Sequence, residues 1–131
     1  MRKKLLLGLV CCLVFVAPAG AGELVVVVHR DSGLENLSRE QVSHLFLGRL
    51  TQLPSGERAR VVEVEPYRER FYRLLVNKEL AEINAYWARL KFSGRTQSPL
   101  RAGSPKAALA QVAGDRATLA FVEAGDVDGH V

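Results

Sequence analysis

The stretch that decides the fold reads LSREQVSHLFLGR, from Leu37 to Arg49, because it specifies both ends of one helix. Ser38 is a good N-cap residue, and Gln41 stands three residues later, where it completes a capping box. Between Gln41 and Gly48, the apolar residues Val42, Leu45 and Phe46 fall on one face at helical spacing. Gly48 stands where a left-handed residue ends a helix. The stretch therefore predicts an amphipathic helix over residues 38–47.

The first residues have the pattern of a secretory signal peptide. Three cations at positions 2–4 precede an apolar run over residues 5–16, and small residues at 19–21 suit a cleavage site. The run of 12 residues is shorter than the roughly 20 that span a bilayer, so an uncleaved anchor is the weaker alternative. We expect a signal peptide at 1–21 and a domain at 22–131 that is exported across the inner membrane to the periplasm, with no transmembrane segment after cleavage.

Removal of this leader changes what the charge and the cysteines imply. The formal net charge is +4, and it falls to +1 without the three leader cations. This balance gives no support to nucleic-acid binding, because the remaining Lys and Arg residues are interspersed with Glu. Cys11 and Cys12 both lie in the leader, so the mature chain has no thiol, disulfide or cysteine metal ligand. They match a lipoprotein signal poorly, which leaves lipidation as a minor alternative.

The mature chain alternates strand and helix patterns. The apolar run Leu24–Val28 fits a strand covered on both faces, as in a parallel sheet. Residues 59–65 alternate Val with Glu, which predicts a strand with one solvent-facing side. A connection of about thirty residues with one helix suits a right-handed βαβ crossover, so we expect these two strands to pair in parallel. The other expected elements are helices beginning at Pro66, Leu80 and Ser104, a strand at 117–122, and a turn at Gly125 before a last strand at 127–131. These elements predict one α/β domain with a mostly parallel sheet and about four flanking helices.

Three segments of the mature chain carry a family resemblance. They read SREQVSHLFLGR from Ser38, AYWARLKFSG over Ala85–Gly94, and TLAFVEAGDVDG from Thr118. Together they resemble the phosphate-type substrate-binding proteins of ABC transporters, and in particular short single-domain variants of that family. The resemblance implies one lobe of the type 2 periplasmic binding protein fold. It also implies an extracytoplasmic protein that delivers an oxyanion such as phosphate to an ABC permease.

The segment with which this family holds its anion differs here. In the family, a Ser-Gly-Thr segment wraps the anion at a helix N-terminus with hydroxyl and backbone N–H groups. The corresponding segment is Glu65–Phe71, EPYRERF, which contains no Ser or Thr. Pro66 removes one N–H donor, and Glu65 places negative charge where the anion would sit. The resemblance therefore implies the family's scaffold with a weakened phosphate site.

Four residues are nevertheless candidate ligand contacts: Ser32, Tyr67, Arg68 and Arg70. The guanidinium groups of Arg68 and Arg70 match oxyanion geometry, and Tyr67 stands beside them at the start of the expected helix. The alternative for Arg70 is a solvated helix residue. Ser32 follows the first strand, where open α/β sheets bind ligands, or it is a plain turn residue.

No motif nominates an enzyme, a metal site or a cofactor. The three histidines, His29, His44 and His130, share no short metal-ligand spacing. The chain has no nucleophile elbow, P-loop or dinucleotide fingerprint. We therefore expect a protein without catalytic activity, metal or cofactor. It either binds a small oxyanion for a permease or serves, on the same scaffold, as a ligand-free interaction module for another envelope protein.

Overall fold

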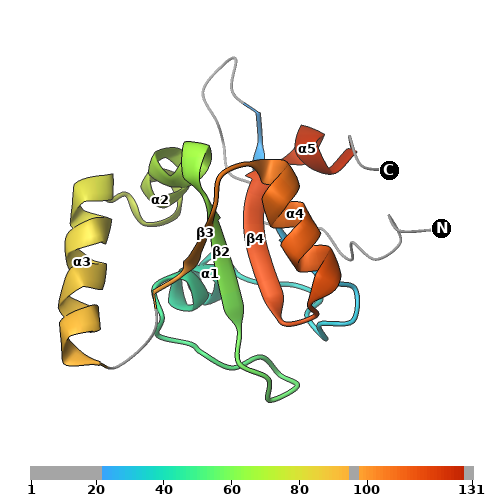
Figure 1. Cartoon of the computed structure of the whole chain (residues 1–131), viewed down its shortest axis with the longest axis horizontal. Helices are drawn as coiled ribbons and strands as arrows, with labels where there is room; N and C mark the ends of the chain where they lie inside the picture. The colour runs from blue at the N-terminus through green and yellow to red at the C-terminus, as the bar shows by residue number, and fades with distance from the viewer. Residues whose placement is uncertain (1–21, 95–97, 129–131) are drawn as a thin grey trace.

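A computed structural model describes residues 22–94 and 98–128, which form a four-stranded sheet with flanking helices (Figure 1). The strands are β1 (Leu24–Val28), β2 (Arg60–Val64), β3 (Leu100–Ala102) and β4 (Thr118–Glu123). The α-helices are α1 (Arg39–Phe46), α2 (Arg68–Val76), α3 (Leu80–Ser93), α4 (Pro105–Gly114) and α5 (Ala124–Asp128), and a 3₁₀ turn, η2 (Glu65–Tyr67), leads into α2. The domain is therefore α/β, as expected.

The sheet is mixed, which corrects the expectation of a mostly parallel sheet. Its strand order is β1-β4-β2-β3; β4 runs parallel to β2 and antiparallel to β1. β1 and β2 are therefore not neighbours and run in opposite directions, so the predicted parallel crossover between them is wrong. All five residues of β1 are buried although β1 is an edge strand. An edge strand that is buried on both faces shows the same continuous apolar run as a central strand of a parallel sheet. The sequence of Leu24–Val28 is therefore compatible with either position.

The helix signals in the sequence are confirmed at their caps. Ser38 Oγ accepts a hydrogen bond from the Gln41 N–H at 3.0 Å, and Gln41 Oε1 accepts one from the Ser38 N–H at 2.8 Å. This reciprocal pair is the predicted capping box. Gly48 has a φ of 76°, in the left-handed region that ends the helix. Ser104 Oγ caps α4 by accepting a hydrogen bond from the Ala107 N–H at 3.2 Å, without a reciprocal bond.

Helices cover both faces of the sheet. α4 packs across all four strands, and Figure 1 shows it in front of the sheet with α1 behind. On the α1 side, Phe121 of β4 stacks on Phe71 of α2, with ring centroids 3.8 Å apart. Phe46 of α1 meets the edge of Phe71 at 5.0 Å. This aromatic cluster fastens α1 and α2 to β4, one of the two central strands, whereas α3 stands to one side against α2 (Figure 1).

The C-terminal elements differ from the sequence expectation. α5 is a short helix where a turn and a strand over 127–131 were expected, and residues 129–131 lie outside the described residues. The Asp126 carboxylate accepts a hydrogen bond from the Tyr67 hydroxyl at 2.8 Å, which ties this helix to the start of α2. β3 was not expected at all, because three residues are too few to show strand alternation.

Candidate anion site beside helix α3

A buried ion pair occupies the centre of the α2 side of the sheet. Glu63 was expected to face solvent, but it is only 1% exposed, and Arg68 is 3% exposed. Arg68 Nε donates to Glu63 Oε1 at 2.6 Å, and the Tyr72 hydroxyl donates to Glu63 Oε2 at 2.5 Å. A carboxylate tolerates burial when it is paired and fully hydrogen-bonded. The prediction of a solvent-facing side is therefore wrong at Glu63, because Arg68 and Tyr72 replace water there.

This Glu63–Arg68 network also joins α2 to α3. The second nitrogen of the Arg68 fork donates to Asn84 Oδ1 at 2.9 Å. Burial raises the pKa of Tyr72 well above its usual value, and the neighbouring Glu63 carboxylate raises it further. Tyr72 therefore stays protonated and keeps donating to Glu63. Arg68, the leading anion-contact candidate, is thus engaged with protein groups on two sides.

Tyr67 and Arg70 belong to a separate cluster beside α5. Arg70 donates to Glu123 Oε2 at 2.6 Å, and its guanidinium carbon lies 5.3 Å from the centre of the Tyr67 ring. Burial raises the pKa of Tyr67, and the hydrogen bond to Asp126 adds to the shift. Arg70 is therefore partly buried and paired, rather than solvated as the alternative had it. The structure brings Tyr67 and Arg70 together but directs Arg68 away from them, toward α3.

Ser32 lies at the opposite edge of the sheet. Its hydroxyl accepts a hydrogen bond from the Leu34 N–H at 3.1 Å, and its own N–H donates to the His29 carbonyl at 3.0 Å. These contacts form an ordinary turn. Because β1 runs antiparallel to β4, its carboxyl end lies away from the carboxyl ends of β2 and β3. The reasoning that grouped Ser32 with the ligand-binding edge was therefore wrong about the strand direction.

A cationic hollow of about 260 Å³ lies between α3 and β3, and we call it the α3–β3 hollow. Arg68, Lys91 and Arg101 line it, against one carboxylate, that of Glu63. Lys91 is exposed and makes no ion pair with any described residue. The Arg101 side chain is 51% exposed, with Nε 3.5 Å from Glu63 and 3.3 Å from Glu65. Positive charge therefore dominates this hollow.

Neutral donors complete the wall of the α3–β3 hollow. Ser98 supplies a hydroxyl, and Trp87 supplies an indole ring from α3. Trp87 is 8% exposed, and its Nε1 has no hydrogen-bond partner among the described residues. Buried indole N–H groups usually find an acceptor. The hollow thus combines two accessible cations, Lys91 and Arg101, with the Ser98 hydroxyl as a neutral donor.

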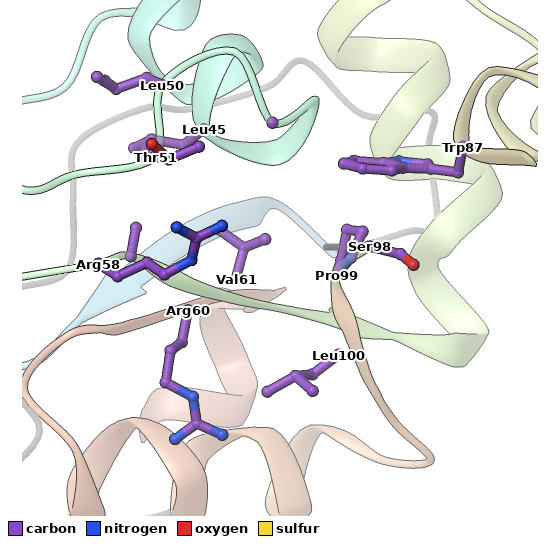
Figure 2. A pocket seen from close by; sticks show the side chains of 12 residues that line it. Leu45, Leu50, Thr51, Arg58, Arg60, Val61, Trp87, Ser98, Pro99 and Leu100 are labelled. Carbon is purple, nitrogen blue, oxygen red and sulfur yellow. The ribbon is translucent and has the colours of Figure 1, made fainter. Parts of the chain in front are cut away.

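A second depression, which we call the edge pocket, lies on another side of Trp87 and has a volume of about 220 Å³ (Figure 2). Figure 2 shows the Trp87 ring facing Leu45 and Thr51 across the pocket, with Pro99 and Leu100 along its β3 side. Most of these groups are apolar. Arg58 and Arg60 also line the pocket, and Arg60 is paired with Asp115 at 2.8 Å. The edge pocket therefore presents two guanidinium groups beside a mostly apolar lining.

Sequence reasoning missed Lys91, Ser98 and Arg101. A usable signal exists on α3, where Asn84, Trp87 and Lys91 follow at spacings of three and four and therefore share one face. Arg101 gave no comparable signal, because it reaches the hollow from the unexpected strand β3.

Comparisons with known proteins identify no family for this chain. No family model matches it, and neither a curated protein nor a solved structure matches. Within residues 22–94 and 98–128, no cluster of three His, Cys, Asp or Glu residues could hold a metal ion. Nor does any helix in those ranges have the length and apolar character needed to cross a membrane.

Proposed function

We propose that this chain is an extracytoplasmic, solute-binding-like protein that binds a small oxyanion, phosphate or sulfate, in the α3–β3 hollow. The observation that carries the proposal is the convergence of Lys91 and Arg101 on a hollow whose other cation, Arg68, is already neutralised by Glu63. Ammonium and guanidinium groups form charge-assisted hydrogen bonds to oxyanions. The exposed Ser98 adds a hydroxyl donor for one of the remaining oxygens.

We expect this binding to be weak. The hollow is open to solvent, and Arg101 divides its charge between Glu63 and Glu65, which an anion would have to compete with. A dissociation constant on the order of a millimolar corresponds to about −4 kcal/mol, which suits one exposed lysine and one arginine that is already shared between two carboxylates.

The biological role in this proposal is capture of the ion outside the cytoplasm and its delivery to an ABC permease. The predicted signal peptide at 1–21 supports the compartment, and the resemblance to phosphate-type binding proteins supports the delivery step. The single α/β domain supports a partner as well, because a lone lobe leaves one side of a bound ion uncovered.

The test is titration of the mature protein with phosphate and with sulfate, by calorimetry and by thermal unfolding. A ligand at ten times its dissociation constant adds about 1.4 kcal/mol of stability, which gives a measurable rise in melting temperature. Lys91→Gln should weaken binding several-fold. Arg89→Gln is the matched control, because it removes one exposed cation two residues away on the same helix without touching this hollow.

Two outcomes would reject the proposal. The first is the absence of both heat and thermal shift at tens of millimolar phosphate and sulfate. The second is an equal loss of binding in Lys91→Gln and Arg89→Gln. That result would mean that the anion is attracted by positive charge in general and does not bind in this hollow.

A ligand-free interaction module is the second candidate, and exposed apolar side chains favour it. Phe92 in α3 is 93% exposed, and Leu100 in β3, which lines the edge pocket, is 40% exposed. Large exposed apolar groups are common at contact surfaces for other proteins. Crosslinking in intact cells, with wild type and Phe92→Ser side by side, tests this. A monomeric protein that yields no reproducible, Phe92-dependent partner would exclude the module.

A further inference from the structure

A third pocket lies on the other flank of α3, where the ends of α1 and α2 meet that helix. Its volume is about 410 Å³, within the range typical of small-molecule sites. Apolar groups form most of its wall: Leu47, Val76, Ile83, Ala85 and the ring of Tyr86. We call it the helix-end pocket. It can remove apolar surface of a ligand from water, which the α3–β3 hollow is too polar to do.

Three cations surround this apolar wall. Arg49, Lys78 and Arg89 all line the helix-end pocket, and all three are exposed. None of them makes an ion pair with a residue in the described part of the chain. The one carboxylate in the lining is that of Glu82, whose Oε1 accepts the Glu79 N–H at 3.1 Å in the capping box of α3. The pocket therefore carries an excess of uncompensated positive charge around an apolar floor.

The ends of α1 and α2 do not cancel this charge. Carbonyl groups at a helix C-terminus carry partial negative charge, which disfavours a nearby anion. Here one carbonyl at each end already accepts from a side chain: the Tyr86 hydroxyl donates to the Leu47 carbonyl at 2.5 Å, and Arg39 donates to the Leu74 carbonyl at 2.5 Å. The accessible potential of the pocket therefore comes from its three cationic side chains.

From this arrangement we infer that the helix-end pocket binds an organic anion with an apolar body, of the class of medium-chain aliphatic carboxylates. The carboxylate would lie among Arg49, Lys78 and Arg89, and the hydrocarbon chain would cover Ile83 and Tyr86. Inorganic phosphate has no apolar part to bury, so the two flanks of α3 take different ligands. The inference does not depend on phosphate binding in the α3–β3 hollow.

The test titrates the mature protein with octanoate below its micellar concentration and follows heat and backbone amide shifts. Two probes separate the contributions: 1-octanol keeps the chain without the charge, and octylammonium reverses the charge. Octanoate should bind at least ten-fold more tightly than either probe. Equal binding of octanoate and octanol would overturn the inference, because charge would then play no part.

Variants locate the site and separate it from phosphate binding. Arg89→Gln should weaken octanoate about ten-fold and leave phosphate unchanged, whereas Lys91→Gln should do the reverse. Ala85→Trp places a large side chain in the pocket at an exposed helix position, and it should abolish octanoate binding with an unchanged circular dichroism spectrum. Octanoate binding that survives Ala85→Trp, or that falls equally in Arg89→Gln and Lys91→Gln, would overturn the assignment to this pocket.

Discussion

Arg68 of α2 and Lys91 of α3 line the same hollow, and they use their charge in opposite ways. On the α2 wall, Arg68 is 3% exposed and is held by Glu63 and Asn84. On the α3 wall, Lys91 is exposed and has no ion-pair partner among residues 22–94 and 98–128. One cation holds helices to the sheet, and the other remains available to a ligand. A cation beside a pocket is therefore more available to an anion the less a carboxylate already neutralises it.

The largest effect is expected when the carboxylate that neutralises Arg68 is removed. Glu63→Gln leaves the Arg68 charge buried without a counter-charge, and we expect a loss of about 3–5 kcal/mol in the free energy of unfolding. Urea denaturation of the mature protein measures it. Glu65→Gln is the control, because that half-exposed carboxylate meets Arg101 at 3.3 Å and should cost less than about 1 kcal/mol. Equal losses in the two variants would contradict a structural role for the Glu63–Arg68 network.

Tyr72→Phe is a smaller change to the same Glu63–Arg68 network, and we expect a smaller loss of stability. It removes one donor from the buried Glu63 carboxylate, and a hydrogen bond to a charged group contributes about 1.5–3 kcal/mol. A pH dependence should accompany the loss. The folded-state pKa of Tyr72 is raised above its unfolded value, so its contribution is complete below a pH of about 10 and is lost as pH rises toward the folded-state pKa.

Urea denaturation between pH 8 and pH 11 measures this dependence. The wild type should lose stability with rising pH more steeply than Tyr72→Phe, which lacks the titrating hydroxyl. Identical slopes for the two proteins would show that the Tyr72 phenol does not contribute as its buried position implies.

The smallest expected effect belongs to the α3 wall. Lys91→Gln should change the free energy of unfolding by less than about 0.5 kcal/mol, as is usual for an exposed side chain without specific contacts. The same denaturation experiment in phosphate-free buffer measures it. A loss above about 1 kcal/mol would mean that Lys91 stabilises the fold, and the difference between the two walls would disappear.

The helices could be predicted because their signals are local. Ser38 and Gln41 stand three residues apart, and Gly48 follows the same helix. One short stretch therefore contains the residues that define both ends of the helix. Strand order depends on pairs that lie far apart in the chain. The insertion of β4 between β1 and β2 leaves no mark on the composition of Leu24–Val28, because any strand buried on both faces is apolar throughout.

The candidate site was predicted only in its residue types. Arg68 was singled out as an anion contact, but its partner in the structure is Glu63, five residues earlier, in a strand whose Val-Glu alternation suggested solvent exposure. That pairing exists only because α2 folds back over β2. Lys91 and Arg101 were missed because they come together from a helix and from a strand of three residues. Tertiary packing, rather than local pattern, decides which charges are free.

The place of β4 in the sheet also determines which contacts can form before the end of the chain is available. β4 is the last of the four described strands along the chain, yet it alone joins β1 to the others and brings Phe121 against Phe71. Until β4 inserts, β1 has no hydrogen-bonded neighbour, and the aromatic cluster lacks its central ring. Such sequence-distant contacts slow folding, because long loops must close before they are stabilised. A growing chain therefore lacks both the pairing of β1 and the complete aromatic cluster until β4 has been added.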